Sequence, residues 1–103
     1  MLRWAYRRYR RPIYVTENGV ADKEDRLRTR HLRGHLDEVY KAISLDGVPV
    51  RGYYYWTLMD NFEWSDGYKI SFGLYRVDRE TKRRTPTKAV PAYREIAEKN
   101  GLP

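Results

Sequence analysis

The segment Ile13-Tyr14-Val15-Thr16-Glu17-Asn18-Gly19 joins a short apolar run, a single carboxylate and an Asn-Gly pair. The apolar run predicts a β-strand that is buried on both faces, as in parallel sheets. Because Asn and Gly tolerate positive φ, the pair is expected to end this strand abruptly. Glu17 would then lie at the carboxyl end of the strand, where parallel sheets bind their ligands. Spacing alone also allows a solvated glutamate on a turn.

A helix and a second strand are predicted after this segment. Asp25 is the expected N-cap of a helix that runs to about Leu45. Its apolar face comprises Leu32, Leu36, Val39, Tyr40 and Ile43. Residues 50–56 are rich in β-branched and aromatic types and predict the second strand. Residues 13–56 thus form a predicted βαβ unit, whose parallel strands bring Glu17 and Trp56 to one edge of the sheet.

Two further helices are expected at the ends of the chain. Leu2, Ala5, Tyr6 and Tyr9 recur at helical spacing before Pro12, which should end the first helix. The arginines at positions 3, 7, 10 and 11 share its other face, which is either solvated or a phosphate-binding stripe. Residues 70–78 are read as extended and residues 79–82 as a turn. The last helix should start near Pro91 and end at Asn100-Gly101.

Composition limits the classes of function. The 103 residues carry a net charge of +7, but the basic residues are scattered, so nucleic acid is not the expected partner. The sequence has no cysteine, no apolar run long enough to cross a membrane and no secretory signal at its start. A cytoplasmic location is expected. His31 and His35 are four apart, but Leu32 occupies the position where a zinc-protease helix has Glu, so neither a metal nor a cofactor is expected.

The run from Trp56 to Trp64 is dense in aromatic and hydrogen-bonding side chains. Sugars suit such a surface, because their C–H faces pack on indole rings while their hydroxyls need carboxylate and amide partners. The alternative to sugar binding is that Trp56, Phe62 and Trp64 belong to a hydrophobic core.

In this order along the chain, the motifs resemble the carboxyl-terminal part of glycoside hydrolase family 1, the retaining β-glucosidases and β-galactosidases. The motifs are Thr16-Glu17-Asn18-Gly19, Gly52-Tyr53, the run from Trp56 to Trp64, Gly67-Tyr68, Phe72-Gly73-Leu74 and Val77-Asp78. The resemblance covers nearly the whole chain. The start of this chain therefore falls inside the family's sequence and carries no information on a leader. It implies an α/β fold that comprises strands 7 and 8 of a (β/α)8 TIM barrel, with residues 1–103 as one carboxyl-terminal segment that is incomplete on its own.

The resemblance also implies roles for single residues. Glu17 would be the catalytic nucleophile that attacks the anomeric carbon. Trp56 would form the platform under the sugar, and the peptide bond from Trp56 to Thr57 is expected to be cis. Glu63 would accept hydrogen bonds from the outer hydroxyls and Trp64 would donate its indole N–H to a neighbouring one. Phe72 would form a wall of the same pocket.

The pattern implies an unphosphorylated β-glycoside as substrate, because relatives that act on 6-phosphorylated sugars lack the Phe62-Glu63-Trp64 tripeptide found here. One position departs from the family. Ile70-Ser71 stands where many members carry basic residues before the Phe-Gly pair. This leaves the local pocket wall undefined without affecting Glu17.

A retaining reaction needs a second carboxyl group as general acid/base, which the resemblance places on an earlier strand, outside this chain. The isolated chain is therefore expected to be nearly inactive, with exposed sheet edges that favour association. Three situations fit the sequence. The chain is a fragment of a β-glycosidase, one subunit of a split barrel that needs the missing amino-terminal portion, or a noncatalytic module that self-associates or binds sugars or polyanions.

Overall fold

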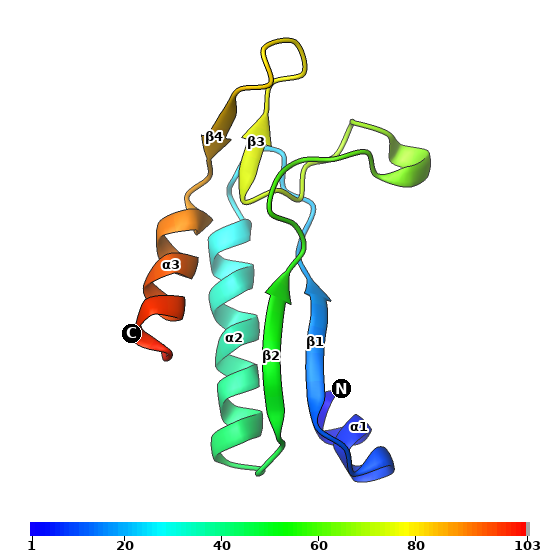
Figure 1. The fold of residues 1–103 in the computed structure, drawn as a ribbon, viewed down its shortest axis with the longest axis vertical. Helices are drawn as coiled ribbons and strands as arrows, with labels where there is room; N and C mark the ends of the chain where they lie inside the picture. Colours follow the sequence, from blue (N-terminus) through cyan, green and yellow to red (C-terminus); the bar gives the residue numbers. More distant parts are fainter. Residues whose placement is uncertain (103) are drawn as a thin grey trace.

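The computed structural model describes residues 1–102, which form three α-helices, a two-stranded parallel sheet and a short antiparallel hairpin. Strand β1 (Ile13–Asn18) is followed by helix α2 (Arg28–Ser44) and strand β2 (Val50–Tyr55). Figure 1 shows β1 and β2 side by side and pointing the same way. The predicted βαβ unit is therefore confirmed. Among the described residues, no helix is both long and apolar enough to cross a membrane.

The remaining elements extend this unit at both ends. Helix α1 (Leu2–Tyr9) precedes β1, and the 3-10 helix η1 (Trp64–Asp66) follows β2. Strands β3 (Tyr75–Val77) and β4 (Arg84–Pro86) form an antiparallel hairpin, and helix α3 (Ala89–Lys99) ends the chain. The extended segment, the turn after it and the last helix, with Pro91 in its first turn, match the sequence predictions. Strand β4 was not predicted.

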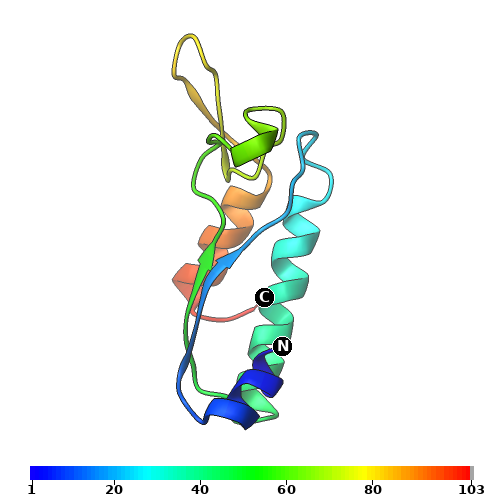
Figure 2. The ribbon, with the colours of Figure 1, turned by 90° about the vertical axis from the view of Figure 1, so that its right-hand side faces the viewer.

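The sheet is covered on one side only. In Figure 2, α1 and α2 lie to one side of β1 and β2, while the other side is bare. Tyr14 and Tyr54 are 58% and 59% exposed, and an added Cβ on Gly52 would touch both of their rings, so the two tyrosines share the bare face. The prediction that β1 is buried on both faces is wrong for this chain, because nothing among the described residues packs on that second face.

The buried core is small and lies on the helical side. Leu32 of α2, Tyr55 of β2, Leu74 and Ala89 of α3 form its centre. Partly buried side chains surround them: Leu36, Tyr53, Tyr75, Val90 and Tyr93. The molecule measures 47 × 32 × 19 Å, and its radius of gyration of 15.2 Å exceeds the roughly 13 Å of a compact domain of this length. It is a thin slab.

Two predicted helix ends need correction. Asp25 is not the N-cap of α2, because it has a positive φ of 58° and lies three residues before the helix. The carboxylate of Asp22 accepts hydrogen bonds from the backbone N–H groups at positions 26, 27 and 28 instead. Helix α1 ends at Tyr9, and the left-handed conformation of its C-cap Arg10 turns the chain two residues before Pro12.

Candidate active site

The carboxyl ends of β1 and β2 meet at one edge of the sheet, as the topology predicted. The Trp56 N–H donates to the Asn18 carbonyl at 3.0 Å. A Cβ added to Gly19 would lie 1.9 Å from the Trp56 carbonyl oxygen, so only glycine fits at position 19. Strand β1 ends at Asn18, as the Asn-Gly pair predicted. Neither residue has a positive φ, so the expected reason is wrong, and Gly19 serves the close approach to Trp56.

A register shift in β1 determines where Glu17 points. Val15 pairs with Tyr53 and Asn18 with Tyr55, so β1 contains one more residue than β2 between these two pairs. Val15 and Asn18 both line a cavity with residues of α2 and therefore face that helix. Thr16 and Glu17 lie between them and are exposed. This is the geometry of a β-bulge, a device that re-aims a side chain. Here it leaves the Glu17 carboxylate accessible.

Trp56 and Glu63 are in direct contact. The Trp56 indole Nε1–H donates to Glu63 Oε1 at 3.0 Å, and the peptide bond from Trp56 to Thr57 is cis, as the resemblance implied. The backbone of Glu63 is fixed by its N–H, which donates to the Gly67 carbonyl at 2.7 Å. The predicted platform and the predicted hydroxyl acceptor are thus brought together. Both follow the carboxyl end of β2, beside the end of β1.

The other two predicted binding residues lie differently. Trp64 is 85% exposed at the start of η1, on the loop that projects to the right above the sheet in Figure 1. Phe72 is half-buried, and its carbonyl accepts from the Thr57 N–H at 3.4 Å, which places its backbone beside the cis bond. Phe72 therefore borders the Trp56 segment, whereas Trp64 extends away from the slab.

A buried polar network that the sequence analysis missed supports the Phe72 segment. The fully buried Arg28 guanidinium donates to the carbonyls of Asp22 at 2.7 Å and Ser71 at 3.0 Å, and it pairs with Asp25 at 3.1 Å. Ser71 in turn donates its hydroxyl to Asp60 Oδ1 at 2.7 Å.

The backbone N–H of Gly73 bonds the same Asp60 oxygen at 2.9 Å. Ser71, at the position where the sequence departs from the family, thus fixes the backbone next to Phe72. No periodicity in the sequence marks Arg28 as buried.

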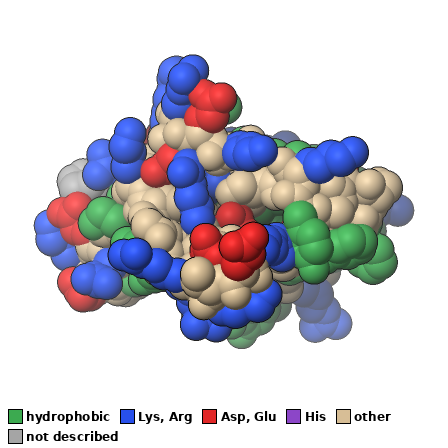
Figure 3. Space-filling view, turned by 90° about the horizontal axis from the view of Figure 1, so that it is seen from above, with side chains coloured by type: hydrophobic (Ala, Val, Ile, Leu, Met, Phe, Trp, Pro, Cys, Tyr) green, Lys and Arg blue, Asp and Glu red, His purple; other side chains and the backbone are tan. Residues whose placement is uncertain are grey.

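The charged and histidine side chains do not form a second site. The end of the molecule seen in Figure 3 carries Lys and Arg around its rim, interleaved with acidic and hydrophobic side chains. Arg3 pairs with Asp46, so the predicted arginine face of α1 is partly neutralised. His31 and His35 stack at 3.9 Å between ring centroids, and burial together with the charge of His35 lowers the pKa of His31. Within residues 1–102, no three acidic or histidine side chains are grouped to hold a metal.

The family model for glycosyl hydrolase family 1 matches residues 1–102. The chain belongs to glycosyl hydrolase family 1. A β-galactosidase from Sulfolobus acidocaldarius is 46% identical over 98 residues, which cover 95% of this chain and 20% of that protein. A β-glycosidase structure from Pyrococcus horikoshii superposes with a TM-score of 0.93 at 46% identity, covering 99% of this chain and 24% of that one.

The solved family 1 neighbours are TIM-barrel enzymes, of which this α/β chain covers only a small part. It spans about a fifth of the length of the curated relatives it matches. A 6-phospho-β-galactosidase from Staphylococcus aureus is also 43% identical over 96 residues. Overall identity therefore does not separate phosphorylated from unphosphorylated substrates within the family.

Proposed function

We propose that this chain is the carboxyl-terminal portion of a retaining β-glycosidase, contributing strands 7 and 8 of the barrel and the nucleophile Glu17. The observation that carries the proposal is the shared edge of β1 and β2. There the bulge exposes Glu17, and the bond from Trp56 to Asn18 places the aromatic segment beside it. A carboxylate next to an aromatic platform supplies the nucleophile, one of the two carboxyl groups that a retaining glycosidase needs, and a surface on which the sugar stacks.

The chemistry follows from these groups. The Glu17 carboxylate attacks the anomeric carbon of a sugar that rests on Trp56, and the glycosidic bond to the leaving group breaks. A general acid supplied from outside this chain protonates the leaving oxygen. The same group then acts as base toward the water that hydrolyses the glycosyl-enzyme. The two carboxyl groups of such a pair lie about 5 to 5.5 Å apart.

Substrate binding is assigned to four side chains. Glu63 accepts hydrogen bonds from the outer sugar hydroxyls, in a position already fixed by the Trp56 indole. Trp64 donates its indole N–H to a neighbouring hydroxyl, and the exposure of its side chain leaves it accessible to a sugar. Phe72 forms a wall beside the platform. The bond to Trp56 leaves Glu63 pre-organised, which lowers the cost of ordering on binding.

The intact Phe62-Glu63-Trp64 tripeptide supports β-glucosides and β-galactosides without a 6-phosphate as the substrate class. A carboxylate at position 63 opposes a phosphate by like-charge repulsion. We therefore expect hydrolysis of an aryl β-galactoside and little hydrolysis of its 6-phosphorylated form.

The test is a chimera in which this chain replaces the matching 98-residue region of the S. acidocaldarius β-galactosidase. The chimera is expected to hydrolyse aryl β-glucosides and β-galactosides. Glu17→Gln should reduce kcat by on the order of 10⁴-fold or more, because the nucleophile is lost. The matched control is Glu98→Gln on the exposed side of α3, which should leave activity unchanged. Equal activity of the two variants would exclude Glu17 as the nucleophile.

A further inference from the structure

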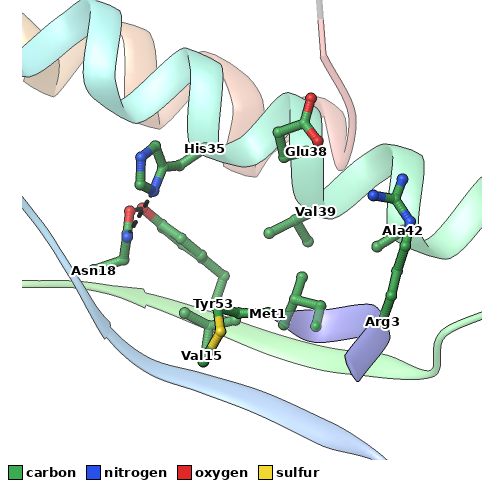
Figure 4. Close-up of a pocket in the computed structure, with 10 residues that line it drawn as sticks. Met1, Arg3, Val15, Asn18, His35, Glu38, Val39, Ala42 and Tyr53 are labelled. Carbon is green, nitrogen blue, oxygen red and sulfur yellow. Dashed lines mark hydrogen bonds between the residues drawn. The ribbon is translucent and has the colours of Figure 1, made fainter. Parts of the chain in front are cut away.

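Three polar side chains converge on the residue after Glu17. Asn18 Nδ2 lies 2.8 Å from Nδ1 of His35 on α2, and the Tyr53 hydroxyl on β2 donates to Asn18 Oδ1 at 2.8 Å. Figure 4 shows all three pointing toward one another across the space between sheet and helix. They line one wall of a cavity of about 350 Å³. None of the three was assigned a role in the reaction above.

Each end of the Asn18 amide has a hydrogen-bond partner on another element. The Asn18 amide nitrogen is the donor of its pair, so Nδ1 of His35 is the acceptor in this arrangement. Burial raises the pKa of the Tyr53 phenol, which therefore remains a donor at physiological pH. Both ends of the Asn18 amide are thus paired, the nitrogen with His35 and the oxygen with Tyr53.

The backbone of Asn18 is held as well. Its carbonyl accepts from the Trp56 N–H at 3.0 Å, so one residue is fixed to α2, to β2 and to the start of the Trp56 segment. Asn18 also closes the bulge, because the extra residue of β1 lies between Val15 and Asn18. Without the hydrogen bonds of the Asn18 side chain, β1 could lose the bulge, and its side chains would again alternate regularly between the two faces of the sheet. Glu17 would then lie on the same side as Val15, toward α2.

We propose that Asn18, held by His35 and Tyr53, is a positioning residue that keeps the bulge in place and aims the Glu17 carboxylate away from α2. This inference rests on the proposed function of Glu17. It concerns the orientation of the nucleophile and not the binding of the sugar, which Trp56 and Glu63 perform. Breaking the hydrogen bonds that join Asn18 to His35 and Tyr53 should therefore reduce kcat and leave KM nearly unchanged.

The chimera described above allows a direct measurement. A 2-deoxy-2-fluoro-glucoside with a good leaving group traps the glycosyl-enzyme of a retaining enzyme. The rate at which this inhibitor becomes attached to the enzyme therefore depends on how well the nucleophile is oriented. Peptide mass spectrometry identifies the labelled residue. Asn18→Leu keeps the size of the side chain and removes both bonds, and we expect labelling of Glu17 to slow by about a hundredfold, as misplacement by about 1 Å would cause.

Two pairs of variants separate positioning from general damage. His35→Asn keeps an acceptor near the place of Nδ1 and should label within about threefold of wild type, whereas His35→Leu should lose about tenfold or more. Tyr53→Phe should also slow labelling. Its control is Tyr40→Phe, a 55% exposed tyrosine of α2 that makes no bond to Asn18, and this variant should not slow it.

The possible failures are distinguishable. Wild-type labelling rates in Asn18→Leu, or equal losses in His35→Asn and His35→Leu, would overturn the positioning role while Glu17 remains the labelled residue. Labelling at a residue other than Glu17 would overturn the proposed function itself, and the positioning role with it.

Discussion

Asp22 shows how a single side chain can organise a junction. Its carboxylate accepts from the backbone N–H groups of Leu27 and Arg28 at 2.8 Å each and of Arg26 at 3.1 Å, and its own N–H donates to the Ser71 carbonyl. Burial by itself would raise the pKa of Asp22. The backbone hydrogen bonds and the nearby Arg28 charge outweigh it, so the pKa lies below its ordinary value.

Replacing Asp22 by Asn should lower the free energy of unfolding by about 1 to 2 kcal/mol at pH 7, because the amide has one acceptor oxygen where the carboxylate uses two, and no charge near Arg28. The difference in the free energy of unfolding between the unchanged chain and Asp22→Asn should become smaller in acid. Because the pKa of Asp22 is lower in the folded than in the unfolded chain, its contribution is present above the unfolded value and is lost as pH falls below about 4. Unfolding midpoints at pH 7, 4 and 2.5 measure this, with Asp66→Asn on exposed η1 as control. A stability difference that does not change with pH would refute the stabilising role of the ionised Asp22 carboxylate.

The segment after β2 approaches the end of β1 and the residues before β3 closely, and a glycine lies at each of these approaches. At Gly19 an added Cβ would meet the Trp56 carbonyl oxygen at 1.9 Å, and at Gly73 it would meet the Asp60 nitrogen at 2.4 Å. These neighbours are backbone atoms, so an added side chain could fit only if the two segments in contact moved apart. On α2, by contrast, an added Cβ at Gly34 would meet nothing within 4 Å.

Gly19→Ala and Gly34→Ala therefore make the same chemical change with opposite expected results. Gly19→Ala should destabilise the chain by at least about 2 kcal/mol, because it forces β1 away from Trp56. Gly34→Ala should stabilise it by about 0.5 to 1 kcal/mol through helix propensity alone. Denaturant unfolding followed by circular dichroism gives both values. Effects of the same sign would contradict the packing described for the edge of the sheet.

The molecule as a whole presents an apolar face with no cover among its described residues. The parallel sheet has only two strands, and its bare side carries the exposed rings of Tyr14 and Tyr54. Unpaired strand edges and apolar patches of this kind promote association. The small one-sided core offers little to resist such pairing.

The isolated chain should therefore self-associate and bind an apolar dye, and it should hydrolyse aryl β-glucosides negligibly. Light scattering on a dilution series, with activity assayed in the same fractions, measures both. Changing Tyr14 and Tyr54 to Lys should reduce association without restoring activity, whereas Tyr40→Lys on α2 serves as the control. A monodisperse monomer at all concentrations would contradict the role of the bare face. Activity in a discrete oligomer would mean that another copy supplies the acid.

Much of this architecture could be predicted from the sequence because local pattern and topology agree. The apolar run before Glu17, the periodic face of α2 and the aromatic strand after it predicted a parallel βαβ unit. That topology alone placed Glu17 and Trp56 at one edge. Motif order identified the family, and with it the cis bond after Trp56.

Features that depend on contacts between distant segments could not be predicted in this way. Nothing near Arg28 in the sequence indicates that its guanidinium is buried against the Ser71 carbonyl, 43 residues away. Asp25 has the local pattern of a helix cap, yet Asp22 performs that role because the chain turns back between them.

For the same reason, alternation along β1 would place Glu17 on the side of Val15, whereas the bulge exposes it. The sequence by itself determined which residues form the strands, the helices and the motifs of the family. The tertiary structure alone decided where the Glu17 carboxylate points, because that direction depends on the hydrogen bonds of Asn18 with His35 and Tyr53, which lie on two other elements.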